Sequence, residues 1–179
     1  MLSRENTGLI VVDVQGKLAR LVANSDAMIG HCRKLILGAK ALGLPIVWLE
    51  QNPDKLGPTV EELAGVLGES SPITKFTFDA CEEPEFLRAV RRWGRDSWLV
   101  CGIEAHICVY QTALHLRRLS YDVHLVCDCV SSRQEANKAL AISRLTHQGV
   151  SMTGLEMSLY ELVKDCRASE FRTLLDLVK

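Results

Sequence analysis

Apolar residues gather in four continuous runs along the chain, and the stretches between them are amphipathic. The runs are rich in β-branched residues and comprise Gly8–Gln15, Leu44–Gln51, Ser97–Glu104 and Tyr121–Val130. Strands that are apolar at consecutive positions are typical of a parallel sheet that is covered on both faces. Two shorter runs, at residues 73–76 and 149–154, are further candidate strands. The pattern therefore predicts up to six strands.

Between and after these runs, apolar positions recur at the spacing of an amphipathic helix. The predicted helices are Asp26–Leu42, Glu83–Trp93, Ile107–Leu119, Gln134–Gln148, Leu155–Val163 and Ser169–Leu177. Residues 52–63 are rich in proline and glycine and predict a surface loop that leads into a short helix. Strands and helices that alternate in this way predict an α/β sandwich with a mostly parallel sheet.

The composition is that of a globular chain. With 179 residues, 47% of them hydrophobic and 24% charged, it can bury a full core, so we expect one domain over residues 1–179. The formal net charge of -1 gives no general attraction to nucleic acid or to an anionic membrane. No apolar run approaches the roughly 20 residues of a membrane helix, and the first ten residues lack the layout of a signal peptide. We therefore expect a cytoplasmic protein.

The seven cysteines are an odd number and form no CxxC pair. This usage is typical of reduced thiols rather than of a disulfide framework. Cys127, Asp128 and Cys129 look like a metal cluster, but alternate residues of a strand more often serve packing, and the spacings of a zinc site are absent. His115 is predicted to be a surface or core residue without a partner.

Polar and reactive side chains follow the predicted strands, at the edge where an open α/β sheet usually binds its ligands. Asp13 follows the first strand, Gln51 ends the second, and Lys75 follows the third. A turn with Glu104 and Cys108 follows the fourth strand along the chain. A carboxylate, an ammonium group and a thiol would then meet at one edge of the sheet. This is the set that an activated sulfur nucleophile needs.

Cys108 stands in the first turn of a predicted helix, just after a glycine turn. The free N–H groups and the dipole of a helix N-terminus favour a thiolate at such a position. Each residue also has a simpler interpretation when it is taken alone. Asp13 can cap a turn, Lys75 can be a solvated loop residue, and Cys108 can be an inert core thiol.

Five segments together resemble the isochorismatase-like cysteine hydrolase family, and within it the branch of isochorismatase domain-containing hydrolases. The matching segments are LIVVDVQ, EQNPDKLGPTVEEL, ITKFTFDAC, GIEAHICVYQTALHL and VCDCVSSR. They extend from about residue 8 to about residue 160, in an order that makes the combination specific. The resemblance implies a doubly wound, six-stranded, Rossmann-like sandwich with helices on both faces.

The resemblance also implies a catalytic triad of Asp13, Lys75 and Cys108. Such an enzyme cleaves the C–N bond of a small amide or ureido substrate through a thioester on the cysteine. Asp13 would take the thiol proton and return it to the leaving group, and Lys75 would stabilise the charges. A cis peptide bond between Ile103 and Glu104 is implied as well, with the backbone N–H groups of Glu104 and Cys108 forming the oxyanion hole.

For the substrate pocket, the predicted lining is Gln51, Phe76, Phe78, Glu104 and Tyr110. The expected partners are a small-molecule substrate and further copies of the chain, as a dimer, a tetramer or a larger homo-oligomer. Neither a nucleic acid nor a membrane is expected as a partner. The resemblance implies no cofactor.

The sequence departs from its relatives at Ala105, where they commonly have threonine. The metal-dependent nicotinamidase branch has an Asp-x-His motif after the second strand, but the corresponding segment here, LEQNPDK, contains no histidine, so no metal is expected. The nucleophilic Cys108 argues against the vinyl-ether hydrolysis of the isochorismatases proper. Ala105 keeps open a second hypothesis, a non-catalytic binding or scaffold protein. A dinucleotide-binding domain is disfavoured because no GxGxxG motif follows the first strand.

Overall fold

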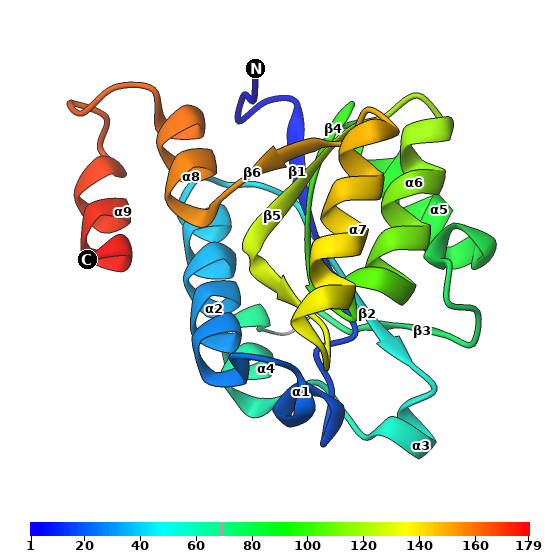
Figure 1. The fold of residues 1–179 in the computed structure, drawn as a ribbon. Helices are drawn as coiled ribbons and strands as arrows, with labels where there is room; N and C mark the ends of the chain where they lie inside the picture. The colour runs from blue at the N-terminus through cyan, green and yellow to red at the C-terminus, as the bar shows by residue number, and fades with distance from the viewer. Residues whose placement is uncertain (69) are drawn as a thin grey trace.

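The computed structural model describes residues 1–68 and 70–179, and a single sheet of parallel strands runs through its centre (Figure 1). The strands are β1 (Thr7–Val12), β2 (Ile46–Gln51), β3 (Ile73–Lys75), β4 (Ser97–Ile103), β5 (Asp122–Ser131) and β6 (Ser151–Thr153). All neighbouring strands pair in parallel, in the order β3-β2-β1-β4-β5-β6. The predicted six-stranded α/β sandwich is confirmed. This is the doubly wound strand order of dinucleotide-binding folds. The chain adds β2 and β3 on one side of β1 and then β4, β5 and β6 on the other, so the switch point lies between β1 and β4.

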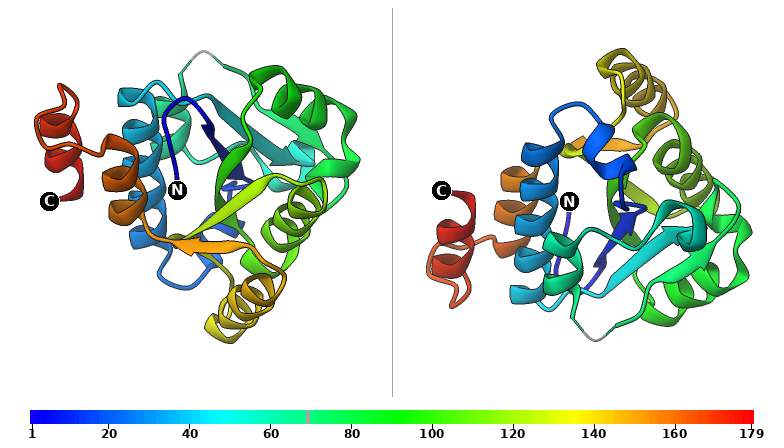
Figure 2. Two further views of the ribbon diagram at one scale, coloured as in Figure 1. Left: turned by 90° about the horizontal axis from the view of Figure 1, so that it is seen from above. Right: turned by 90° about the horizontal axis from the view of Figure 1, so that it is seen from below.

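Helices cover both faces of the sheet (Figures 1 and 2). One layer contains α2 (Ser25–Ala41), α4 (Glu61–Leu67) and α8 (Leu155–Val163), and α9 (Phe171–Val178) packs on the outer side of α2 and α8. The opposite layer contains α5 (Pro84–Trp93), α6 (Tyr110–Arg118) and α7 (Glu135–His147). Two short helices, α1 (Leu18–Leu21) and α3 (Pro53–Leu56), lie beyond the carboxyl ends of the strands. Over the part of the chain described, no helix has both the length and the apolarity that a membrane crossing needs.

The continuous apolar runs are explained by the two cores that the sheet separates. Along β1, Leu9 and Val11 pack against the α2 layer, whereas Ile10 and Val12 pack against the layer of α5 and α6. All six residues of β1 are buried. A strand buried on both faces has no polar face, and this is why the alternation of an exposed strand is missing from the sequence.

The predicted boundaries of the long elements differ from the observed ones by a few residues. The larger differences lie at the carboxyl edge of the sheet. Residues 52–63 contain not only the start of α4 but also α3. The helix predicted from Ile107 begins only at Tyr110. Before it lies a π-helical turn, η2 (Ala105–Val109), which holds Cys108. Such turns occur frequently at functional sites.

Gly102 allows the carboxyl ends of β1 and β4 to approach closely. It pairs with Val12 in the sheet and has a φ of +116°, in the region that favours glycine. A Cβ atom at this position would lie 2.0 Å from the carbonyl oxygen of Val12. The residues that come after Val12 and Gly102, namely Asp13 and Ile103, are thereby brought to the same part of the edge.

Candidate active site

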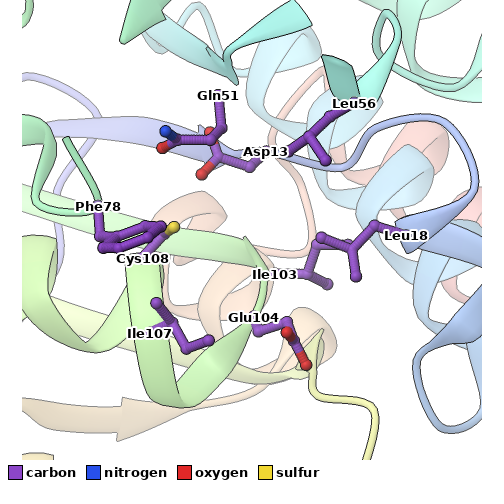
Figure 3. A pocket seen from close by; sticks show the side chains of 9 residues that line it. All are labelled: Asp13, Leu18, Gln51, Leu56, Phe78, Ile103, Glu104, Ile107 and Cys108. Carbon is purple, nitrogen blue, oxygen red and sulfur yellow. The ribbon is translucent and has the colours of Figure 1, made fainter. Parts of the chain in front are cut away.

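Asp13, Lys75 and Cys108 come from three segments and meet at the carboxyl edge of the sheet. Asp13 follows β1, Lys75 is the last residue of β3, and Cys108 lies in the π-helical turn after β4. Asp13 has a left-handed backbone, with a φ of 50°, and such conformations cluster at functional sites in proteins generally. Asp13 and Cys108 line one cavity, which is shown in Figure 3.

Lys75 and Asp13 form a buried ion pair. The Lys75 Nζ atom donates to Asp13 Oδ2 at 2.8 Å, and the side chains are 0% and 2% exposed. The same Nζ atom donates to Gln51 Oε1 at 2.6 Å and to the carbonyl oxygen of Thr77 at 3.2 Å. Because an ammonium group has three protons, these three acceptors use all of them. Lys75 is therefore held in one position and compensates the charge of Asp13.

Gln51 positions Lys75 and is itself fixed at both ends of its amide. Its Nε2 atom donates to the carbonyl oxygen of Phe76 at 2.7 Å, while Oε1 accepts from Lys75. Its backbone N–H donates to Gln15 Oε1 at 2.7 Å. The fully buried Gln15 also donates to the carbonyl oxygen of Gly57 at 2.7 Å. Gln15 thus joins the end of β2 to the segment after α3, a role that the sequence analysis missed.

Glu50 stabilises the same segment instead of taking part in the cavity. Its Oε1 atom accepts from the backbone N–H of Thr59 at 2.6 Å and from the Thr59 hydroxyl at 2.8 Å. A backbone bridge between Gln15 and Thr59 runs alongside. These contacts hold residues 52–60 over the ends of β1 and β2.

The second carboxylate oxygen of Asp13 is free to act. Asp13 Oδ1 is buried and has no hydrogen-bond partner among the described residues. Burial raises the pKa of Asp13 above its ordinary value, and the charge and hydrogen bond of Lys75 work in the opposite direction. The Cys108 thiol interacts with this carboxylate. A carboxylate with one fixed and one unpaired oxygen beside a thiol is arranged to accept the thiol proton.

The surroundings of Cys108 favour the protonated thiol, opposite to the effect expected from a helix N-terminus alone. Burial and then the charge of Asp13 raise the thiol pKa to about 12, although the charge of Lys75 lowers it. A helix terminus contributes only about 0.3–1 kcal/mol to such an equilibrium. Here Cys108 lies in a π-helical turn ahead of α6 and is 7% exposed. The stronger effects of burial and of the neighbouring carboxylate therefore prevail.

The turn between β4 and η2 begins with a cis peptide bond between Ile103 and Glu104, as expected. The Glu104 carbonyl oxygen accepts from the N–H groups of Ile107 and Val109, at 3.0 and 3.3 Å. In contrast, neither the N–H of Glu104 nor that of Cys108 donates to a backbone carbonyl outside its own element within residues 1–68 and 70–179. Both donors remain available to a ligand.

The Glu104 side chain anchors this turn. Its carboxylate accepts from the backbone N–H of Arg133 at 2.9 Å and from Arg133 Nε at 3.1 Å. Glu104 is 5% exposed, whereas the Arg133 side chain is 58% exposed. The pair connects the start of η2 to the loop after β5 and fixes the backbone beside Cys108.

The cavity is small and mostly apolar. It has a volume of about 110 Å³ and is lined by Asp13, Leu18, Gln51, Leu56, Phe78, Ile103, Glu104, Ile107 and Cys108. Figure 3 shows the aliphatic side chains facing one another across it, with the carboxylate of Asp13 and the amide of Gln51 on one wall. The site therefore presents few polar groups to a ligand.

Three of the five residues predicted to line the pocket, Gln51, Phe78 and Glu104, do line this cavity. The prediction needs correction for the other two. Phe76 points outward with 70% exposure and contributes only its carbonyl oxygen, to Gln51. Tyr110 lines a separate surface hollow, where it packs under the guanidinium of Arg144.

Four aliphatic residues that were not predicted from the sequence form a wall of the cavity: Leu18, Leu56, Ile103 and Ile107. Ile103 and Ile107 flank the cysteine turn that was singled out, so their position was a usable signal. Leu18 and Leu56 come from α1 and α3, two helices that the apolar pattern did not predict.

Comparison with known proteins gives a consistent result. The model of the isochorismatase domain matches residues 7–157. The secreted isochorismatase effector Isc1 of Phytophthora sojae is 34% identical over 96% of this chain and 83% of its own length. The MAR1 ribonuclease of Caenorhabditis elegans superposes with a TM-score of 0.93 at 31% identity, over 99% of this chain and 91% of that one. YcaC of Escherichia coli, an octameric hydrolase of unknown specificity, superposes with a TM-score of 0.93 at 24% identity, over 98% and 89%.

Proposed function

The chain belongs to the isochorismatase family, and on that premise we propose that it is a cysteine hydrolase. Its reaction is the cleavage of a C–N bond, of the amide or ureido type, in a small molecule. Asp13, Lys75 and Cys108 form the catalytic triad, and a thioester on Cys108 is the intermediate. The fold and the family alone are compatible with several hydrolytic reactions. The arrangement of side chains favours this one.

One observation carries the proposal. Asp13 is buried, its Oδ2 atom is fixed by Lys75 at 2.8 Å, its Oδ1 atom has no hydrogen-bond partner among the described residues, and the Cys108 thiol interacts with the carboxylate. An unpaired buried oxygen costs free energy. A proton that moves from the thiol to this oxygen when a substrate binds would remove that cost and generate the nucleophile at the same time.

The reaction then follows with its atoms balanced. The Cys108 sulfur attacks the substrate carbonyl carbon, and its proton passes to Asp13 Oδ1. The carbonyl oxygen becomes an oxyanion that accepts from the N–H groups of Glu104 and Cys108. When the C–N bond breaks, Asp13 gives the proton to the leaving nitrogen and a thioester remains. Water, deprotonated by Asp13, cleaves the thioester and returns the thiol and an acid.

The cavity favours an uncharged acyl group with few atoms. Its walls are mostly aliphatic, and the cations nearby are already engaged, Lys75 with Asp13 and Arg133 with Glu104. A substrate carboxylate would lose its hydration without gaining a free cationic partner. Short, neutral amides therefore fit the site better than ureido acids do.

The relatives differ in what their names imply, so the remaining expectations form part of this proposal. The Caenorhabditis elegans neighbour is named a ribonuclease, but here a small apolar cavity and a net charge of -1 do not favour a phosphodiester. We propose a homo-oligomer, which the octameric neighbour from Escherichia coli supports. We also propose a cytoplasmic location, although the Phytophthora sojae relative is named as secreted.

A substrate screen tests the proposal. The protein is incubated with short neutral amides, with ureido acids and with a single-stranded RNA, and the release of ammonia and of cleaved RNA is measured. We expect ammonia from at least one neutral amide and no cleaved RNA. The Cys108→Ser variant should be inactive, and Cys166→Ser, which removes an exposed thiol, should retain activity. RNA cleavage, or amide hydrolysis that survives Cys108→Ser, would refute the proposal, and inactivity on every compound would favour a scaffold protein.

A further inference from the structure

Asp79, Cys81 and His115 form a second group of reactive side chains. Their ligand-type atoms all lie within 4.8 Å of one another, and no other group of three or more such residues is found in the described part of the chain. His115 Nδ1 lies 2.7 Å from Asp79 Oδ2, so the prediction that His115 has no partner is wrong. A carboxylate, a thiol and an imidazole are the three side-chain types that bind zinc.

We propose that Asp79, Cys81 and His115 bind a zinc ion. Glu82 supplies the fourth ligand of a tetrahedral site, because its Oε1 atom lies 3.9 Å from His115 Nδ1 and its side chain is 62% exposed and free to turn. One sulfur, one nitrogen and two oxygen ligands suit zinc better than magnesium or calcium, which prefer oxygen alone.

The site is closed on one side and open on the other. Cys81 is 4% exposed and faces the core beneath α6. On the outer side, a surface hollow of about 360 Å³ gives access and is lined by Asp79, Glu82, Gln111, Leu114, His115, Arg118 and Leu119. Arg118 is the cation of this hollow. The carboxylates of Asp79 and Glu82, together with the thiolate of Cys81, outweigh its charge when a metal binds.

The backbone that carries the ligands is already fixed. Asp79 precedes the short 3-10 turn η1 (Ala80–Glu82), and its Oδ1 atom accepts from the N–H of Cys81 at 2.9 Å. The N–H of Ala80 donates to Thr112 Oγ1 at 3.0 Å. Thr112 and His115 are three residues apart on α6 and therefore share a face of the helix. The metal would meet ligands whose backbone needs no rearrangement.

Binding would exchange protons for the metal. Burial and the charge of Asp79 raise the pKa of the Cys81 thiol, so the thiol is protonated beforehand. The sulfur releases this proton to solvent as the sulfur–zinc bond forms. In the hydrogen bond to Asp79 Oδ2, His115 Nδ1 carries the proton. When the metal binds, this proton leaves to solvent and Nε2 takes one up, so Nδ1 offers its lone pair and Oδ2 is released to the metal.

The site adjoins the segment that carries Lys75 and does not depend on the proposed hydrolase activity. The Thr77 hydroxyl donates to the carbonyl oxygen of Asp79 at 2.8 Å, and the Thr77 carbonyl oxygen accepts from Lys75 at 3.2 Å. A bound zinc would link this segment to α6 and stabilise it. Metal binding is therefore measured directly, without reference to turnover.

The test uses the full chain and two metals. Zn²⁺ is titrated in competition with a chromophoric chelator, and Co²⁺ is added separately because its bond to a thiolate gives an intense charge-transfer band. We expect one equivalent of either metal, and a band that Cys81→Ser abolishes. Zinc affinity should fall roughly 100-fold or more in this variant, because loss of an outer partner alone costs 10–100-fold.

Control variants separate this site from the other thiols. Cys166→Ser and Cys108→Ser should each retain the band and the affinity of the wild type. His115→Gln should also weaken zinc binding, and because His115 is half-exposed it decides the matter if Cys81→Ser does not fold. Zinc binding that is absent from the wild type, unchanged in Cys81→Ser or His115→Gln, or lost in Cys108→Ser would overturn the proposal.

Discussion

Asp13 shows how strongly a single residue depends on its neighbours. Burial raises the pKa of its carboxyl group, whereas the charge and hydrogen bond of Lys75 lower it. The same carboxylate raises the pKa of Cys108. The three side chains therefore form one titrating unit, and a change at one of them alters the other two.

The first prediction concerns the pH dependence of Cys108. Because its pKa is raised to about 12 from an ordinary 9.0, the thiol is protonated at neutral pH and ionises only as the pH rises. Alkylation by iodoacetamide, followed by peptide mapping, should therefore continue to accelerate through about pH 10. In urea, the alkylation rate of the same cysteine should level off above a pH of about 9, the ordinary pKa of a thiol. A plateau at neutral pH in the folded protein would show a resting thiolate and contradict the account.

Asp13→Asn separates the electrostatic role of Asp13 from its role as a base. With the negative charge removed and Lys75 retained, the pKa of Cys108 should fall. Turnover should nevertheless fall by roughly 10²–10⁴-fold, because the base is gone. The alkylation profile and the rate of ammonia release measure the two effects. If the variant keeps its turnover while the thiol titrates lower, Asp13 is not the base.

Lys75→Met tests the buried ion pair through stability. Removing one partner of a buried pair costs about 3–5 kcal/mol of unfolding free energy. Without Lys75, the pKa of Asp13 in the folded variant would be higher than in the wild type. As the pH rises, the folded variant would therefore keep a proton on Asp13 that the unfolded chain has already lost. The loss of stability should therefore be larger at pH 8 than at pH 5. Urea unfolding at both pH values measures it, with the exposed Lys55→Met as control. A loss that is independent of pH would contradict the pairing.

At the scale of the elements, the sequence predicts those strands and helices whose own residues carry a periodic apolar pattern. The four long strands and the longer helices were predicted within a few residues, because burial on one or both faces leaves a periodic signal. The helices α1 and α3 were missed, since four residues are too few to show a helical period. The π-helical turn at Cys108 was missed as well, because it depends on the contacts of Glu104 with Ile107 and Val109.

Gly102→Ala tests whether the approach of β1 and β4 positions the site. A Cβ atom would collide with the Val12 carbonyl oxygen, and the φ of +116° disfavours alanine. We expect a loss of about 3 kcal/mol, at the upper end of ordinary point substitutions. Gly30→Ala is the matched control, because nothing lies within 4 Å of its Cβ position inside α2. That variant should gain about 0.5–1 kcal/mol. Similar effects of both substitutions in urea unfolding would contradict the argument.

At the scale of the whole molecule, the parallel sheet converts distant sequence positions into one site. The rule that ligands bind at the carboxyl edge brought Asp13, Lys75 and Cys108 together with other candidates, and the family resemblance singled them out as a triad. It was not sufficient for the cavity walls, because Leu18 and Leu56 belong to the short helices α1 and α3, and Leu56 reaches the site through the folding of residues 52–60 over the edge. The same holds for Asp79, Cys81 and His115, whose proximity depends on how η1 packs against α6.

The central claim is that Cys108 forms a covalent bond with the acyl group of an amide, and mass spectrometry tests this most directly. The protein is mixed with an amide that it hydrolyses, quenched with acid within one turnover, and digested. The account predicts that the peptide with Cys108 gains the mass of the acyl group, that Cys108→Ser gains none, and that hydroxylamine removes it. Turnover without an adduct, or an adduct on another residue, would contradict the claim.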